Sequence, residues 1–339
     1  MHQRLRLERV GPEALHPVET YPDFTVFQTD AWLAFLQETQ RGEAVFAQVT
    51  ADSQVVGRFS GVLLKRSGVW LLGSPAPGST TGYMGFNLDH GISRRDALEA
   101  LIRDGFREFG CLHLEVMDRR IDIEDARALS LKYRATSGFE VDLTQPEDQL
   151  FSSMTSACRR CVRKAEKSGV AIEEARDSDF AHEYYGQLRD VFAKQRLVPT
   201  YPEERVVALV KHLLPTGHLL LLRARDADGD CIATGIFPAA NDFMFFWGGA
   251  SWRSGQAVRP NEALQWAAMT FWKARGIRAY DMGGGGDYKR KYGGREVSGA
   301  WVRHSKYQIL ESLRDLAQRG NRLQQRFRGF AQSMPSQRQ

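Results

Sequence analysis

The sequence contains few cysteines and no long apolar segment. Its four cysteines include one Cys-x-x-C pair, Cys158 and Cys161, without the second Cys or His pair that a zinc site of this kind requires. We therefore expect no metal. No stretch approaches the roughly 20 apolar residues of a membrane span, and Met1–Val10 lacks the apolar region of a signal peptide. These absences predict a cytoplasmic protein.

The overall composition is that of a globular chain, but its positive charge is unevenly distributed. Hydrophobic residues make up 42% of the 339 residues and charged residues 26%, which is typical of a folded domain or two. The net charge is +5, yet the segment from Trp301 to the end carries +6 by itself. The excess indicates contact with an anion such as RNA, a phosphorylated substrate or a lipid surface. A solvated helix face is the alternative.

The order of predicted strands and helices repeats in the two halves of the chain. The first half has β-runs within residues 44–72, a loop, a helix over Ser93–Phe109 and a strand at Cys111–Val116. The second has β-runs within residues 218–247, a loop, a helix over Asn261–Arg275 and a strand at Ile277–Met282. A repeat this long indicates duplication of a whole α/β domain, because solenoid repeats have periods of about 20–50 residues.

This order of elements is the core order of the acetyltransferase (GNAT) fold. We therefore predict an α/β protein with two tandem GNAT-like acyltransferase domains, at residues 1–143 and 144–305, followed by a basic helix or tail at 306–339. In that fold the loop and the helix N-terminus hold a pyrophosphate, because free N–H groups and the helix dipole attract an anion. The first-domain loop Ser74–Gly85 is a candidate wall for an acceptor groove.

Three segments contain candidate site residues. The predicted helix Gln149–Ser168 has five cations in nine residues, of which Arg160, Arg163 and Lys164 are candidate phosphate ligands; a solvated basic face is the alternative. The loop Ser251–Glu262 contributes Arg253 and Asn261 as further candidates. It departs from the usual CoA-binding pattern, because Gly255 follows Arg253 too closely and Pro260 has no N–H for a phosphate.

The third segment, Tyr280–Gly294, contains six glycines and three consecutive cations. Asp281 ends a predicted strand and is followed by Gly283 and Gly284, where a ligand can approach the backbone closely. The cations are flanked by Tyr288 and Tyr292. A flexible surface loop with basic ends is the alternative, but the position after a strand end favours a site.

Together, the runs C-R-R-C-V-R-K-A-E-K-S-G-V, R-P-N-E-A-L-Q-W-A-A, G-I-R-A-Y-D-M-G-G and Y-K-R-K-Y-G-G resemble the FemAB family and its CelD-like acetyltransferase relatives. The resemblance implies two GNAT-like domains and transfer of an acyl group to an amine. In the best-known members the donor is aminoacyl-tRNA and the acceptor is a peptidoglycan precursor. The resemblance also implies that Lys289 lies near the acceptor and the transferred group. Relatives that use acyl-CoA share these segments, so the donor stays open between aminoacyl-tRNA and acyl-CoA, with no tightly bound cofactor.

The chemistry of acyl transfer suggests a role for each of these residues. The amine must lose a proton, the oxyanion must be stabilised and the leaving group must be protonated. Asp281 is the candidate base, Lys289 the candidate cation for the oxyanion, and Tyr288 or Tyr292 the candidate acid. The sequence offers no evident serine–histidine pair, so we expect direct attack on the donor. A non-catalytic RNA- or phosphate-binding protein on the same fold is the rival interpretation.

The expected partners are the donor, an amine-bearing cell-envelope precursor and, through the basic tail, a peripheral contact with membrane. The oligomeric state is left open.

Overall fold

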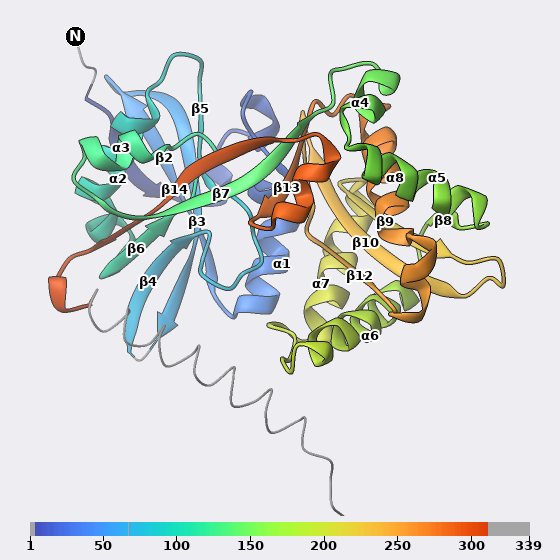
Figure 1. Ribbon diagram of the computed structural model, residues 1–339. Helices are drawn as coiled ribbons and strands as arrows, with labels where there is room; N and C mark the ends of the chain where they lie inside the picture. The colour runs from blue at the N-terminus through green and yellow to red at the C-terminus, as the bar shows by residue number, and fades with distance from the viewer. Residues whose placement is uncertain (1–3, 67, 311–339) are drawn as a thin grey trace, which may run out of the picture.

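The computed structural model describes residues 4–66 and 68–310, and its strands form one sheet that runs through both halves of the chain (Figure 1). The order along the sheet is β1-β2-β3-β4-β6-β14-β7-β13-β11-β10-β9-β8, with β5 paired to β3 and β12 paired to β10. The first half contains β1 (Arg6–Val10), α1 (Asp30–Gln40), β2 (Glu43–Ala51), β3 (Gln54–Arg66), β4 (Val69–Ser74), β5 (Gly85–Leu88), α2 (Arg94–Phe109), β6 (His113–Val116), α3 (Ile123–Ala128) and β7 (Lys132–Asp142).

The second half repeats this order with an additional pair of helices at its start. It contains α4 (Glu147–Ser153), α5 (Ser156–Lys167), β8 (Ala171–Glu174), α6 (Asp179–Lys194), α7 (Glu203–Leu213), β9 (Leu219–Arg225), β10 (Cys231–Ala240), β11 (Phe243–Phe245), β12 (Gly248–Ser251), α8 (Pro260–Lys273), β13 (Ala279–Gly284) and β14 (Arg295–Ser305). Short 3-10 turns include η5 (Ser254–Val258) and η6 (Asp287–Tyr292). The expected α/β fold of two GNAT-like units is confirmed.

The helices begin where side chains supply the missing hydrogen-bond acceptors. The hydroxyls of Thr29, Ser93 and Thr155 accept hydrogen bonds from backbone N–H groups in the first turns of α1, α2 and α5, respectively. The cap at Thr155 corrects one prediction: the helix expected over Gln149–Ser168 is two helices, α4 and α5. Met154 has an extended backbone between them, so α5 has its own N-terminus beside η6.

Three hydrophobic cores lie against the sheet. The central core joins the halves, because Trp32 and Phe35 of α1 pack in one cluster with Tyr184 of α6 and Leu209 of α7. Helix α2 packs on the first half of the sheet and forms another hydrophobic cluster with it. Helix α8 packs on the second half and forms the last of the three clusters. Figure 1 shows α1 and α7 together beneath the centre of the sheet. Burial of this central cluster ties the two halves into one body.

The last strands of the two halves are exchanged. β7 closes the first half in sequence, yet it pairs with β13 of the second half; β14 closes the second half, yet it pairs with β6 of the first. β7 and β14 also pair with each other along most of their length. Accordingly, Ala300 and Val302 of β14 lie in the core of the first half. The domain bounds 1–143 and 144–305 remain a prediction. The sheet itself continues across the boundary between them.

Candidate functional site

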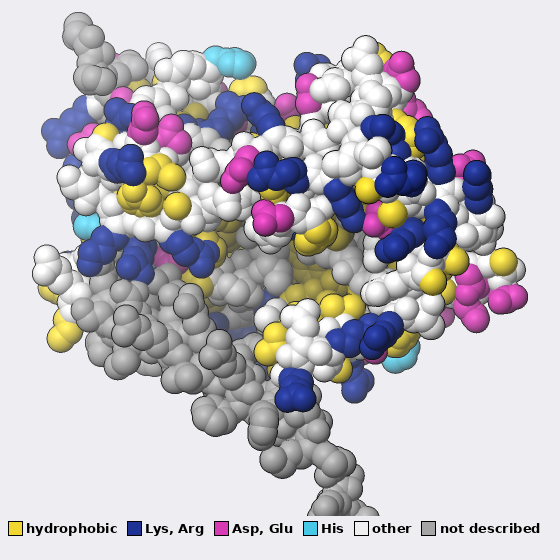
Figure 2. All heavy atoms as spheres, in the orientation of Figure 1, with side chains coloured by type: hydrophobic (Ala, Val, Ile, Leu, Met, Phe, Trp, Pro, Cys, Tyr) yellow, Lys and Arg dark blue, Asp and Glu magenta, His cyan; other side chains and the backbone are white. Residues whose placement is uncertain are grey.

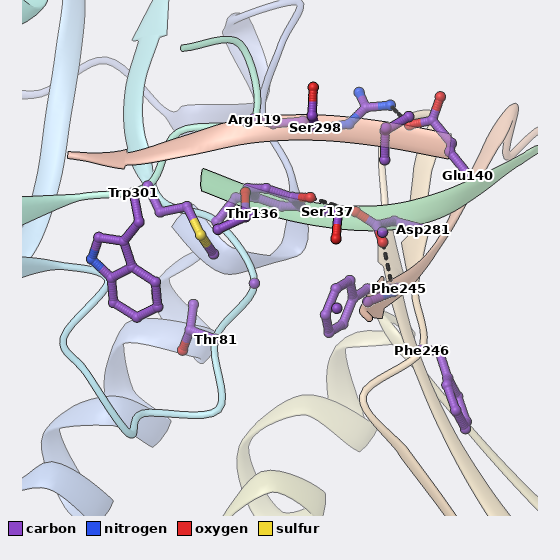
Figure 3. A pocket seen from close by; sticks show the side chains of 18 of the residues that line it. Thr81, Arg119, Thr136, Ser137, Glu140, Phe245, Phe246, Asp281, Ser298 and Trp301 are labelled. Atoms are coloured by element: carbon purple, nitrogen blue, oxygen red, sulfur yellow. Dashed lines mark hydrogen bonds and ion pairs between the residues drawn. The ribbon is translucent and has the colours of Figure 1, made fainter. Parts of the chain in front are cut away.

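A cavity of about 650 Å³ lies where the two halves meet. β7 and β14 form one wall, the loop at Thr80–Tyr83 a second, and the chain at Phe245–Trp247 a third. Figure 3 shows Trp301 and Thr81 at one end, and Asp281, Phe245 and Phe246 at the other. Part of the loop Ser74–Gly85, which the sequence offered as a candidate wall of an acceptor groove, thus borders the cavity.

Alternate residues of β7 and β14 line this cavity in directly opposed pairs. Glu140 faces Arg295 at one end, Gly138 faces Val297 and Thr136 faces Gly299 in the middle, and Arg134 faces Trp301 at the other end. All eight residues border the cavity. Since successive side chains of a strand alternate between faces, these four pairs share one face of the ribbon. Small residues at its centre leave room for a ligand between two charged ends.

Asp281 lies at the end of the cavity where β13 meets β7. Its side chain is 2% exposed and accepts hydrogen bonds from the Tyr83 hydroxyl and from the Gly283 N–H, both at 2.6 Å. Burial raises the pKa of the Asp281 carboxyl above its usual value, and the two donated hydrogen bonds oppose that rise. A buried carboxyl with a raised pKa is suited to take up a proton.

Lys289 lies in η6 and is 7% exposed. Its ammonium group donates to the carbonyl oxygens of Met282 and Gly284 at 2.6 and 2.7 Å, so two of its three N–H groups are used. Burial lowers the pKa of Lys289, whereas the charge of Asp281 raises it. The Met282 and Gly284 carbonyls therefore hold a cation at the cavity wall with one N–H left for a ligand.

A second cavity, of about 290 Å³, lies beside the first. It is bordered by β10, β12, the first turns of α8, and Tyr288, Lys291 and Tyr292 of η6. Phe246 borders both cavities. Tyr292 is only 2% exposed and its pKa is raised by burial, while Tyr288 is 58% exposed. η6 thus presents Lys289 to the first cavity and both tyrosines to the second.

The N-terminus of α8 is already occupied by protein groups. Pro260 supplies no N–H, and Glu262 in the first turn is 8% exposed and pairs with Lys291 at 2.7 Å. Asn261, a candidate phosphate ligand, instead donates its side-chain N–H to Ser251 Oγ at 3.1 Å. An anion bound here would have to displace or approach a buried carboxylate.

Exposed cations surround this region. Arg160, Arg163 and Lys164 are exposed on α5, and Arg253 is exposed beside η5. α5 starts against η6, since the Thr155 N–H donates to the Lys291 carbonyl at 2.9 Å. Figure 2 shows Lys and Arg side chains gathered over this part of the second half. Arg163 also lies over the Phe151 ring, at 5.3 Å.

Sequence analysis did not identify the residues that the first half and β14 contribute. Tyr83, Arg119 and Glu140 surround Asp281, with Arg119 and Arg295 both paired to Glu140, at 2.6 and 2.7 Å. The only sequence signal for them was the glycine-rich loop that contains Tyr83. Their convergence depends on strand exchange, which no local pattern reveals.

One expectation was wrong. A serine and a histidine do pair: Ser305 Oγ lies 2.6 Å from His113 Nδ1, and His113 Nε2 lies 3.1 Å from Glu115. All three are buried in β6 and β14 and none borders the cavities described above. Their pairing follows from strand register, because Ser305 is directly opposite His113.

Residues 4–66 and 68–310 contain no helix that is long and apolar enough to cross a membrane, and in this part of the chain no group of three or more His, Cys, Asp or Glu could hold a metal ion. Most of the predicted basic tail, residues 311–339, lies outside the described residues.

The fold and the cavities together define a class, that of tandem GNAT-like acyltransferases. Residues 152–291 match the family model of the acetyltransferase (GNAT) domain, and this acyltransferase assignment agrees with the cavity beside α8. No curated protein matches the sequence.

Solved structures specify the architecture further. The structure resembles FemX with a TM-score of 0.70 and 14% identity, over 87% of this chain and 96% of that one. It also resembles a tandem GNAT protein of the clavulanic acid biosynthesis pathway, with a TM-score of 0.54 and 10% identity over 89% of this chain and 99% of that one. A third similar structure is L-PGS from Bacillus licheniformis, with a TM-score of 0.51 and 13% identity over 92% of this chain and 97% of that one. The fold is therefore shared with FemX and with a tandem GNAT protein, with two GNAT-like units in one chain.

Proposed function

We propose that this protein transfers an aminoacyl group from aminoacyl-tRNA to an amine of a peptidoglycan-type precursor. The observation that carries this choice of donor is the first turn of α8. Pro260 and the buried Glu262, which pairs with the partly exposed Lys291, occupy the position where free N–H groups would bind a pyrophosphate. The exposed cations of α5 and Arg253 offer a phosphate backbone a broad surface instead.

In this proposal the two cavities hold the two substrates. The donor's aminoacyl ester lies in the cavity beside α8, and the acceptor lies in the cavity between the halves, so that they meet at Phe246 and Lys289. The acceptor amine loses a proton to Asp281 and forms a C–N bond with the ester carbonyl. The remaining N–H of Lys289 stabilises the oxyanion. The ester C–O bond then breaks, and Tyr288 donates its proton to the departing ribose oxygen, which becomes a hydroxyl.

Acyl-CoA is the second candidate donor. The narrow cavity of about 290 Å³ between β10, β12 and α8 is the observation that favours it, together with the match to the GNAT domain model. The extended acyl-thioester arm of acyl-CoA would enter this cavity, and the phosphates of the CoA moiety would bind to the basic surface around Arg253.

The test is donor competition with purified protein. Labelled aminoacyl-tRNA and labelled acyl-CoA are each supplied with a mixed pool of peptidoglycan precursors and amino sugars. We expect label from tRNA in an amide product, and a loss of about 100-fold or more in Lys289→Met, because one electrostatic contact to an oxyanion contributes that much. Lys211→Met, on an exposed lysine of α7 paired with Glu38, is the matched control. Consumption of acyl-CoA alone would exclude the tRNA donor, and binding without turnover would favour a non-catalytic protein.

A further inference from the structure

The cavity between the halves has a strong excess of positive charge. Five cations border it, Arg119, Arg120, Arg134, Lys289 and Arg295, against two carboxyl groups, Glu140 and Asp281. The cations exceed the carboxylates by three. Such an excess within one concave surface raises the local concentration of anions. The ligand of this cavity should therefore itself be anionic.

Two of the three excess charges lie at one end. Glu140 pairs with both Arg119 and Arg295 beside Asp281. By contrast, neither Arg120 nor Arg134 forms an ion pair with another residue in the described part of the chain, and both are exposed. The Arg134 guanidinium lies 4.7 Å from the centre of the Trp301 ring. This end combines two uncompensated arginines with a flat aromatic surface.

Strand geometry gives the separation of the two ends. Arg134 and Glu140 lie on the same face of β7, six residues apart, and a strand rises about 3.3 Å per residue. The open, arginine-rich end is thus roughly 20 Å from the end that holds Glu140 and its neighbour Asp281. The hydroxyl side chain of Thr136 lies between them (Figure 3).

We propose that Arg120, Arg134 and Trp301 form a subsite for a phosphate or carboxylate group of the acceptor, far from the amine that reacts. The acceptor is accordingly an elongated molecule with its amine at Asp281 and an anionic group, next to a ring or apolar group, at Trp301. This inference rests on the proposed function for the identity of the reacting end. The anion is bound by charge and by stacking over the indole.

The subsite can be tested without any donor. Phenyl phosphate and benzoate combine a ring with each of the two anions, and benzyl alcohol is the uncharged control. Calorimetric titration should show that at least one of the anions binds, and that Arg120→Gln/Arg134→Gln weakens it at least tenfold, since each hydrogen bond to a charged group contributes appreciably. Trp301→Leu should weaken the binding of each anion that the wild type binds. Arg107→Gln, an exposed arginine of α2 outside the cavity, should leave binding unchanged.

The relative affinities of phenyl phosphate and benzoate identify the anion. Equal affinity of wild type and the double variant for both would overturn the subsite, provided that the variant keeps the unfolding midpoint of wild type. Its failure is distinguishable from failure of the proposed function: arginine-dependent binding can persist where no donor supports turnover, and Lys289-dependent turnover can persist where the arginines have no effect. In a working transfer assay, the double variant should raise KM for the anionic acceptor and leave kcat unchanged.

Discussion

At the scale of single residues, the candidate site brings together two buried ionisable groups whose burial opposes their charges. Burial raises the pKa of Asp281 and lowers that of Lys289, and the charge of Asp281 partly restores the latter. In each case burial disfavours the charged form, and both groups lie on the wall of one cavity.

Asp281→Asn should separate stability from activity. Because the folded-state pKa of Asp281 is raised, its contribution to stability is present below its unfolded pKa of about 3.9 and is lost as the pH rises through the folded value. The asparagine side chain does not ionise, so the variant does not lose stability in this way. The stability of the variant minus that of wild type should therefore be larger at pH 7 than at pH 4. Transfer should fall about 100-fold or more if Asp281 is the base. Urea midpoints at the two pH values, with turnover at pH 7, measure both; an active variant would remove Asp281 from the base role.

Tyr83→Phe should move the pH dependence of activity. The Tyr83 hydroxyl donates to Asp281 and thereby holds its pKa down. Without this donor the pKa of Asp281 rises further, and the acid limb of the pH–rate profile should shift to higher pH. Full activity at high pH is expected to survive. A profile that falls uniformly, with no shift, would indicate that Tyr83 only supports the loop.

At the scale of elements, the junction of η6 and α5 determines where Lys289 lies. Gly293 ends η6 with a φ of +82°, and a Cβ there would lie 2.9 Å from the Ser153 carbonyl oxygen. This glycine is required both by its backbone conformation and by close contact with the end of α4.

Gly293→Ala should therefore destabilise the protein more than Gly276→Ala. Gly276 has a similar φ of +87° but open space around it, so its substitution measures the conformational cost alone, about 1 kcal/mol. We expect Gly293→Ala to cost a further 1 kcal/mol or more, on the order of an overpacked contact. Denaturant unfolding of both variants gives the comparison. Equal losses would mean that Ser153 moves aside freely.

Elements were predictable where the signal was local. The helix over Ser93–Phe109, the duplicated order and the glycine-rich segment after Asp281 all follow from local patterns in the sequence. The break at Met154–Thr155 was missed because Met154, Cys158 and Ala165 continue across it at helical spacing. The β7–β14 wall could not be predicted, since its partners are about 160 residues apart and their register depends on both halves at once.

At the scale of the whole molecule, strand exchange makes the halves interdependent. β7 has both its neighbours, β14 and β13, from the second half. A fragment of residues 1–143 would thus contain an unpaired strand and an uncovered central core.

Neither residues 1–143 nor residues 144–339 should fold alone. Expressed separately, each is expected to be unfolded or aggregated; expressed together, they should co-purify and recover the circular dichroism of the intact chain. The intact chain should unfold in a single transition. Two independent transitions, or a folded isolated half, would show that the predicted domains are autonomous after all.

The exchange has one more consequence, for the direction of the cavity. In a symmetric dimer of single units, the two ends of the ribbon of exchanged strands would carry the same residues, because two-fold symmetry repeats each pair of opposed residues. Joining the units in one chain removes that constraint. Here one end of the ribbon carries the Glu140–Arg295 pair and the other carries Arg134 against Trp301. A chain that contains both units thus has a polarity that a homodimer cannot have, so that a long ligand can lie in the cavity in only one direction.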